Sequence, residues 1–245
     1  MKYSVDGLVI WETKTGEADR VINILTGKGL ITAYSKGSLR PKNKLASSTA
    51  LLSYSSFELF KGSNMYSVDE AEPLFRFLKL STDMKAYALV LYFCELLKTL
   101  VLNEDDTSEY LSLMLNAMYL IDREDVDLEL IKSAFEFKVM QIAGYMPDIF
   151  SCDICGKEDA KEGARFDLAN GVIICASCAR DKGMPLNCNV ATLEALRYIL
   201  NADIKKVFSF RLKGDSLRSL SYLTSRYVEN HLEFLPRTLE FYQSL

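Results

Sequence analysis

Cys152-Asp-Ile-Cys155 and, nineteen residues later, Cys175-Ala-Ser-Cys178 form the stretch that decides how the rest of this chain is interpreted. Two Cys-x-x-Cys pairs at such a separation are typical of a zinc site. Two thiolates with two residues between them can bind the same ion. A second such pair completes the tetrahedron of a closed structural site. The sequence therefore predicts one structural Zn²⁺ held by Cys152, Cys155, Cys175 and Cys178.

The segment between the two pairs predicts a β-hairpin. Residues 164–169 and 172–175 flank Asn170-Gly171, a dipeptide that strongly favours a tight hairpin turn. Such a hairpin would return the second cysteine pair to the side of the first. Gly156, directly after the first pair, can adopt the positive φ that a turn around a metal often requires.

Three other uses of these cysteines stay open from the residues alone. Two disulfides would need an oxidising compartment. A redox Cys-x-x-Cys is expected near a βαβ pattern, which does not surround these pairs. A catalytic zinc keeps one coordination position open, whereas four thiolates leave none. We favour a metal that only stabilises a small subdomain.

Length and composition limit the class of protein that this chain can be. The chain has 245 residues, of which 49% are hydrophobic, enough for one large domain or two to three small ones. It contains no apolar run long enough to span a membrane, and its start lacks the apolar core of a signal peptide. We therefore expect a cytoplasmic protein with reduced thiols. Cys94 lies in an apolar helical run and is expected in the core, and Cys188 has no evident role.

The first eighty residues predict a small β-barrel. Gly16, Gly27, Gly29, Gly37 and Gly62 separate short apolar runs, as turns do between strands. The expected strands are residues 8–12, 20–25, 29–35, 51–60 and 65–69. Five short strands within about seventy residues favour a closed barrel, because closure removes exposed sheet edges.

Charge is unevenly distributed along the chain, whose net charge is −4. Residues 1–80 hold eleven Lys/Arg against eight Asp/Glu, residues 81–150 five against thirteen, and residues 151–245 thirteen against twelve. The segment from Lys36 to Lys44 carries four cations and no acid. A basic loop on a small barrel, with Tyr34 just before it, fits a nucleic-acid backbone and base stacking, although such loops are often only solvated.

The remainder predicts helices on both sides of the cysteine segment. Their expected ranges are 81–102, 107–121, 128–143, 192–200 and 216–231, with a loop at 103–106, and we expect them to pack as one helical body. A cluster of carboxylates near 122–129 resembles a two-metal nuclease site, yet acids in a first helical turn are usually solvated. Its members are Asp122, Glu124, Asp125, Asp127 and Glu129. His231 is the sole histidine, so no histidine-based triad is favoured.

The combination of these parts resembles the RecO family of bacterial recombination mediators over nearly the whole chain. The matching stretches are Gly16-Glu-Ala-Asp-Arg20, Leu25-Thr26, Gly29, Lys36-Gly37, Arg40-Pro41-Lys42, Glu70-Ala-Glu72, Gly144-Tyr-Met-Pro-Asp and Cys152-Asp-Ile-Cys155-Gly156, with a looser match around Arg226, Leu232 and Leu245. The resemblance implies an α+β multidomain fold: an N-terminal OB-fold β-barrel, an α-helical body and a four-cysteine zinc-finger insert.

The resemblance also implies a function without catalysis. Similar proteins bind single- and double-stranded DNA, anneal complementary strands, act with RecR, and help RecA displace single-strand-binding protein (SSB), whose acidic C-terminal tail they contact. Such a role places the protein at the nucleoid in the DNA repair and recombination pathway named after RecF. The residues implied to contact DNA are Lys36 and Arg40 first, then Arg20, Lys42 and Lys44, then Lys14.

Four segments are expected: an OB-fold domain at 1–80, helical parts at 81–148 and 187–245, and the zinc insert at 149–186. The alternative function is a zinc-stabilised OB-fold adaptor in transcription or translation that lacks strand-annealing activity. A third hypothesis is a metal-dependent nuclease built on the acidic turn.

Overall fold

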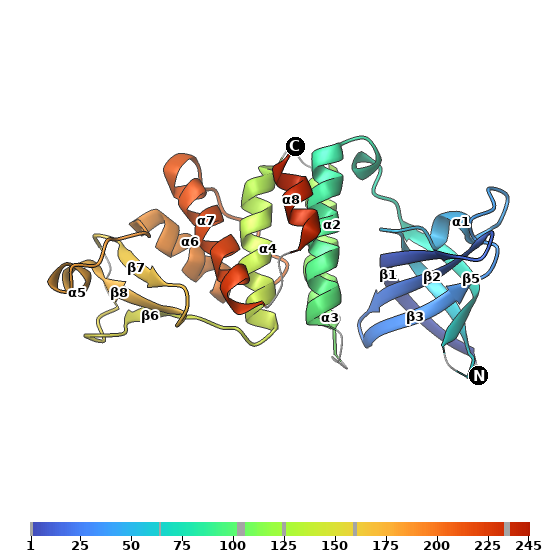
Figure 1. The fold of residues 1–245 in the computed structure, drawn as a ribbon, viewed down its shortest axis with the longest axis horizontal. Coiled ribbons are helices and arrows are strands. Elements are labelled where there is room, and N and C mark those ends of the chain that lie inside the picture. The colour runs from blue at the N-terminus through green and yellow to red at the C-terminus, as the bar shows by residue number, and fades with distance from the viewer. Residues whose placement is uncertain (1, 64, 102–105, 124–125, 159–160, 233–235) are drawn as a thin grey trace. The chain divides into compact units, whose positions relative to one another are not determined.

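A computed structural model describes residues 2–63, 65–101, 106–123, 126–158, 161–232 and 236–245 (Figure 1). The chain divides into two compact units, residues 1–124 with 236–245, and residues 125–235. Among the described residues, the barrel shares the first unit with the one-turn helix α1 (Leu45–Ser48) and three longer helices, and the cysteine segment shares the second with three others. The expected domain boundaries, with a separate helical body, stay a prediction. Most of the expected loop at 103–106, and Glu124 and Asp125 of the acidic turn, lie outside the described residues.

The first unit begins with a closed five-stranded barrel of the OB-fold type, as predicted. Around the barrel the strand order is β1-β2-β3-β5-β4, and every pairing is antiparallel except the short one between β3 and β5. The strands are β1 (Lys2–Thr15), β2 (Asp19–Thr26), β3 (Gly29–Ser35), β4 (Tyr54–Lys61) and β5 (Tyr66–Phe75). Apolar side chains such as Ile22, Ile24 and Phe57 fill the interior.

Only β3 keeps its predicted range: β2 is one residue longer at each end, β5 extends to Phe75 and not to residue 69, and β1 and β4 differ as follows. β1 begins at Lys2 because its first residues pair with β4, from Lys2 opposite Phe60 onward. At Gly7 the strand also meets β2 closely, since a Cβ there would lie 2.4 Å from Cγ2 of Ile24. β4 begins at Tyr54 and not at residue 51, because Leu52 has a φ of 65° and turns the chain. The Leu52 N–H donates to the Val9 carbonyl at 2.8 Å, at an irregularity in the β1–β2 register.

Three helices complete the first unit. They are α2 (Met84–Leu100), α3 (Ser108–Arg123) and α8 (Arg237–Gln243), and a 3-10 turn, Lys79–Ser81, precedes α2. Asp83 caps α2 by accepting the Ala86 N–H at 3.0 Å. Glu95 on α2 accepts the Thr238 N–H at 3.0 Å, which ties α8 to α2. The Lys98 ammonium lies 3.7 Å from the ring centre of Trp11, so α2 also contacts β1.

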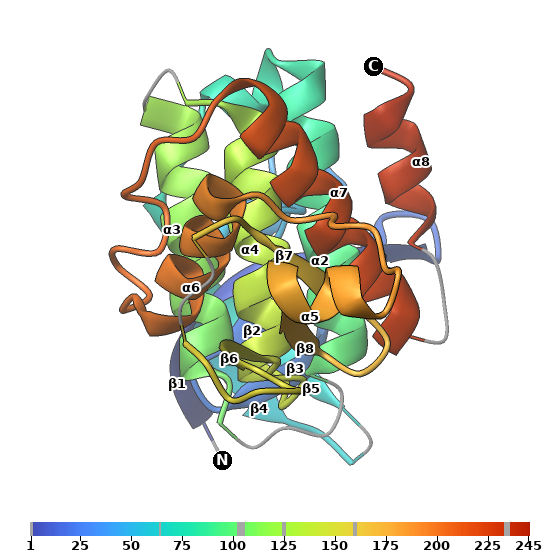
Figure 2. The same cartoon turned by 90° about the vertical axis from the view of Figure 1, so that its left-hand side faces the viewer.

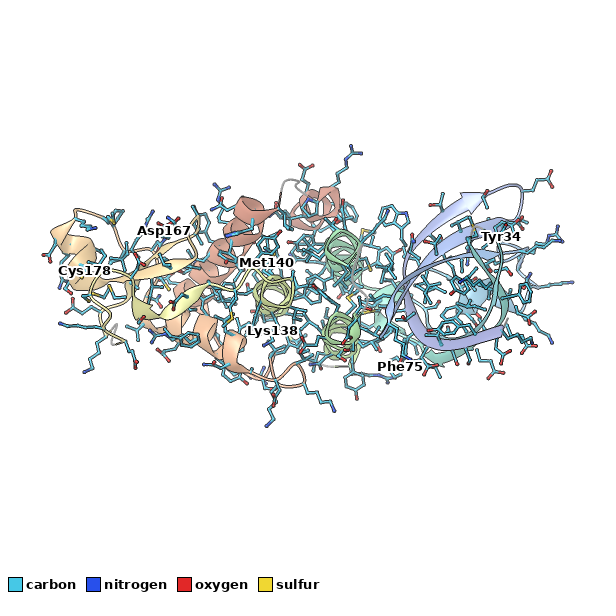
Figure 3. The ribbon with its side chains drawn as sticks, turned by 90° about the horizontal axis from the view of Figure 1, so that it is seen from below. Tyr34, Phe75, Lys138, Met140, Asp167 and Cys178 are labelled. Atoms are coloured by element: carbon cyan, nitrogen blue, oxygen red, sulfur yellow. The ribbon has the colours of Figure 1, made fainter. Side chains whose placement is uncertain are left out.

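Helices α4 (Leu128–Ile142), α6 (Val190–Asn201) and α7 (Gly214–His231) form the body of the second unit (Figure 2). The residues of α4 from Leu130 to Met140 are all buried. Lys138 uses its ammonium to cap the end of α6, donating to the carbonyls of Ile199, Leu200 and Ala202 (Figure 3). These three contacts compensate for the cost of burying the Lys138 ammonium.

The cysteine segment folds beside these helices as a small sheet with a short helix. The sheet order is β6-β8-β7, formed by β6 (Asp148–Cys152), β7 (Ala164–Asp167) and β8 (Val172–Cys175), and α5 (Ala176–Asp181) follows. The predicted hairpin is present as β7 and β8. Its first strand ends at Asp167 because that carboxylate accepts the N–H groups of Ala169 and Asn170, which begins the turn.

No helix within the described ranges is long and apolar enough to cross a membrane.

Candidate nucleic-acid interface and metal centre

The basic loop, residues 36–44 between β3 and α1 (Leu45–Ser48), is built from successive tight turns. The Arg40 N–H donates to the Gly37 carbonyl at 3.0 Å, and the Asn43 N–H donates to the Arg40 carbonyl at 2.9 Å. Asn43 also joins the two ends of the loop, because its Nδ2 donates to the Lys36 carbonyl and its Oδ1 accepts the Leu45 N–H. The loop therefore has a defined shape.

Four of the six residues predicted to contact DNA project from this loop. Lys36, Arg40, Lys42 and Lys44 are exposed. Within the described part of the chain, none of the four forms an ion pair at 4.0 Å or less. Lys14 is also exposed, on β1 opposite Arg20 in the register of β2. The structure thus groups four cations on one loop, with a fifth on a strand.

Arg20 is the exception among the six, because its side chain is only 12% exposed. Its guanidinium donates to the Ala46 carbonyl at 3.1 Å and to Thr49 Oγ1 at 3.5 Å. Its Nε lies 3.4 Å from a carboxylate oxygen of Glu12. Its role as a DNA contact stays a prediction, and its observed partners are all in the protein.

Asp19 meets Tyr34, which is labelled in Figure 3, at the start of the basic loop. The Tyr34 hydroxyl donates to one carboxylate oxygen of Asp19, and the Gly37 N–H donates to the other at 2.6 Å. The Tyr34 hydroxyl first, and then this N–H, hold the pKa of Asp19 below its usual value. Stacking of a base on Tyr34 stays a prediction, for a ring that is half-buried and hydrogen-bonded.

A hollow of about 560 Å³ lies where the basic loop meets β5. Asn43, Lys44 and Leu45 line it on the loop side, and residues 69–72 line it on the strand side. Three of those four strand residues are the acids Asp69, Glu70 and Glu72. Glu70 also lies opposite Glu58 in the β4–β5 register. The barrel therefore changes sign of charge from the loop to this strand.

The four motif cysteines come together in the second unit. Their sulfur atoms all lie within 4.8 Å of one another, although the residues come from β6, the turn after it, β8 and α5. Gly156 has a φ of 69° at the turn, as expected, and its N–H donates to the Cys152 carbonyl at 2.8 Å. The cluster can hold one metal ion.

The geometry of the cluster fits four-coordinate binding. A tetrahedral ion with metal–sulfur bonds of about 2.3 Å has sulfur atoms about 3.8 Å apart. The Cys155 and Cys175 sulfurs lie 3.8 Å apart. A disulfide would need about 2.05 Å, and all six cysteines are free, which removes the two-disulfide alternative.

Hydrogen bonds prepare two of these thiols for ionisation. The Ser177 hydroxyl, 3.2 Å from the Cys175 sulfur, and the Cys178 N–H lower the pKa of Cys175 to about 6. Burial opposes ionisation of Cys152, but backbone N–H groups, including that of Cys175 at 3.3 Å, lower its pKa overall. Hydrogen bonding with Cys175 and Cys155 raises the pKa of Cys178 to about 12, because the protonated thiol is the form that donates to their sulfur atoms.

Cationic side chains lie beside the cluster. A hollow of about 260 Å³ next to Cys175 is lined by Lys157, Lys161 and Arg180 together with Glu162. Arg180 pairs with Glu162 at 2.5 Å. Four thiolates around a divalent ion carry two net negative charges, and these cations offset them.

The other candidates from the sequence do not assemble into sites among the described residues. Asp122 accepts the Lys79 N–H, and Asp127 caps α4, so both act as local caps, whereas Glu129 accepts the Ser221 hydroxyl of α7. The four cysteines are the only metal-ligand cluster found in that part of the chain. His231 ends α7, with Nδ1 2.8 Å from the Tyr227 carbonyl oxygen. Cys94 and Cys188 are buried, and burial raises the pKa of both thiols.

Comparison with known proteins agrees along the whole chain. The family described as "Recombination protein O N terminal" matches residues 1–77, and "Recombination protein O C terminal" matches residues 81–240. The chain is similar to the DNA repair protein RecO of Acetivibrio thermocellus, with 31% identity over 98% of this chain and 95% of that protein. It is also similar to the DNA repair protein RecO of Alkaliphilus metalliredigens, with 30% identity over 95% of each. This chain belongs to the RecO family of DNA repair proteins.

Proposed function

We propose that this protein binds single- and double-stranded DNA through its barrel, anneals complementary strands, and works with RecR to help load RecA on DNA coated by SSB. Contact with the acidic C-terminal tail of SSB belongs to the same proposal. The protein acts in the cytoplasm, at the nucleoid, and without catalytic turnover. Membership of a DNA repair family supports the general role, and the basic loop supports the mode of DNA binding.

One observation carries the mode of binding. The basic loop holds four exposed cations whose ion pairing is absent among the described residues, and its turns fix their arrangement. Annealing requires two polyanions to approach each other. A cationic surface lowers their repulsion by replacing condensed counterions, so binding must weaken as salt rises.

The proposed metal is one Zn²⁺ per chain, bound by the four cysteines. Thiolates are ligands that zinc prefers, and four of them leave no position for water or substrate. Bound there, the ion would hold β6, β8 and α5 together and supply no chemistry. The residues of the insert then act by keeping this small sheet folded.

A salt titration of DNA binding tests the mode of binding. Changing Lys36→Ala with Arg40→Ala removes two phosphate contacts, so the slope of log affinity against log salt for single-stranded DNA falls by about 1.4. Lys28→Ala with Lys61→Ala is the matched control, because it removes two exposed cations from the same barrel outside the loop. Equal slopes in the two double variants would remove the basic loop from the mechanism.

An annealing assay tests the function itself. Complementary oligonucleotides, bare or coated with SSB, should anneal faster with the wild-type protein and more slowly with the Lys36→Ala/Arg40→Ala variant. Binding of RNA or protein without faster annealing would favour the adaptor alternative. Magnesium-dependent cleavage of the strands would contradict a non-catalytic role.

A further inference from the structure

Asp19 and Arg20 are the first two residues of β2; Asp19 binds the start of the basic loop, and Arg20 binds α1, which directly follows the loop. Asp19 accepts the Gly37 N–H at 2.6 Å, and the Leu39 N–H donates to the Ala18 carbonyl at 2.8 Å. The start of the loop is thus fixed to Ala18 and Asp19, where β2 begins. Both carboxylate oxygens of Asp19 are occupied, because the second accepts the Tyr34 hydroxyl.

Arg20 holds α1, just beyond the far end of the loop. Its guanidinium donates to the Ala46 carbonyl at 3.1 Å and lies 3.5 Å from Thr49 Oγ1. Glu12 supports this arrangement, since its carboxylate lies 3.4 Å from Arg20 Nε and accepts the Leu51 N–H at 3.2 Å. The loop is therefore held at Gly37 by Asp19, while Arg20, the next residue in the sequence, holds Ala46 of α1, two residues after the loop ends.

A loop with four like charges needs such restraint. The cations repel one another, and an unrestrained loop would separate them and lose more conformational freedom on binding a phosphate backbone. The hydrogen bonds of Asp19 and Arg20 to the protein oppose both effects. Their partners are in the protein, which distinguishes them from the exposed cations of the loop.

We infer that Asp19 and Arg20 are positioning residues, which hold the basic loop in the shape that presents its cations to DNA. This inference rests on the proposed function. It assigns a role to an acidic residue inside a DNA-binding surface, where charge alone predicts that an acid weakens binding. It also replaces direct phosphate contact by Arg20 with an indirect role.

Substitution of Asp19 should change DNA affinity in opposite directions if this residue acts only through its charge and if it positions the loop. Asp19→Ala removes a negative charge beside the loop, so charge alone predicts tighter DNA binding. Positioning predicts affinity lower by about tenfold, the effect of one lost hydrogen bond of ordinary strength. Glu17→Ala is the matched control, because Glu17 is an exposed acid in the turn just before β2. This variant should bind DNA no more weakly than the wild type.

Asp19→Asn provides the conservative comparison. The amide keeps an oxygen for the Gly37 N–H and a polar group for Tyr34, but it lacks the charge. Positioning predicts that Asn recovers part of the affinity that Ala loses. Charge alone predicts that the Asn and Ala variants bind DNA equally, and equal affinities would overturn the role of Asp19.

Amide hydrogen exchange tests the restraint without DNA. In Asp19→Ala and Arg20→Ala, amides of residues 37–46 should exchange faster, while the β1, β4 and β5 amides should exchange at wild-type rates if the barrel stays folded. Arg20→Lys keeps the charge but loses the forked donor, so positioning predicts faster exchange there too. Wild-type exchange throughout the loop in these variants would overturn the inference.

The two proposals fail in different ways. If Lys36→Ala/Arg40→Ala leaves DNA binding unchanged, the proposed mode of binding is wrong, whatever the exchange rates show. If that double variant weakens binding but Asp19→Ala strengthens it as Glu17→Ala does, only the positioning role is wrong.

Discussion

Lys132 and Glu136 form a buried ion pair on α4, with Nζ 2.9 Å from the carboxylate. Lys132 is 1% exposed and Glu136 is fully buried. Ser225 on α7 accepts from Lys132 at 2.6 Å, and Thr224 donates to Glu136 at 2.8 Å. The pair therefore sets how α7 lies on α4, because any other alignment would leave a buried charge without these partners.

Removing one member of this pair should destabilise the second unit strongly. Glu136→Leu leaves the Lys132 ammonium buried without its carboxylate, and we expect a loss of about 3 to 5 kcal/mol in the free energy of unfolding. Denaturant titration followed by circular dichroism measures it. The double variant Lys132→Met/Glu136→Leu should recover most of the loss, and a double variant as unstable as the single one would contradict this account.

Single residues also show what a sequence does and does not reveal. The spacing of the four cysteines predicted their meeting, because a Cys-x-x-Cys pair constrains its own geometry. Arg20 was predicted only as a DNA contact, since nothing in its neighbours along the chain reveals that Ala46 and Glu12 surround it. Long-range partners of a charged side chain become visible only with the fold.

At the scale of elements, the basic loop depends on one glycine. Gly37 has a φ of 66°, and a Cβ there would lie 2.9 Å from Asn43 Nδ2, the atom that closes the loop. A side chain at this position would strain the backbone and displace Asn43 together.

Gly37→Ala should therefore disturb the loop more than Gly16→Ala does. Gly16 also has a positive φ, 57°, but a Cβ there would meet nothing closer than 3.7 Å. Both changes carry the cost of a left-handed alanine, about 1 to 2 kcal/mol, so their difference isolates the contact with Asn43. Hydrogen exchange of residues 37–46 and DNA affinity provide the readouts. Equal effects of the two substitutions would show that Asn43 does not matter.

The elements that the sequence did not predict are short. α1, β6, α5 and α8 have four, five, six and seven residues, too few for a hydrophobic period to appear. β6 exists because β8 supplies a partner for it, and α8 is fixed by Glu95, far away in the sequence. In contrast, the long periodic helices α2, α3 and α4 were predicted to within a few residues.

For the whole molecule, the division into two units predicts a separable response to metal removal. Zinc bound by the cysteines stabilises the folded form of the unit that contains them. A strong chelator should therefore lower the unfolding transition of residues 125–235 and leave that of the barrel unchanged. Trp11, the only tryptophan, lies in the barrel unit and reports on it by fluorescence.

The measurement begins with the metal content of protein purified without added metal, for which one zinc per chain is expected. Cys178→Ser should lose the metal, whereas Cys188→Ser, at a buried cysteine outside the cluster, should retain it. Content below about half an equivalent in the wild type would count against a structural site. If the chelator lowers the unfolding transition reported by Trp11 as much as that of residues 125–235, the two units unfold together.

The acids of β5 have a consequence for where bound DNA can run. Asp69, Glu70 and Glu72 line the same hollow as Lys44, so a nucleic-acid strand that reaches this end of the basic loop meets repulsion on one side. We expect the contact between DNA and the protein to end near Lys44, and the strand to turn away from the β4–β5 hairpin. An acidic margin of this kind gives the strand a defined direction of exit, which a uniformly positive barrel would not provide.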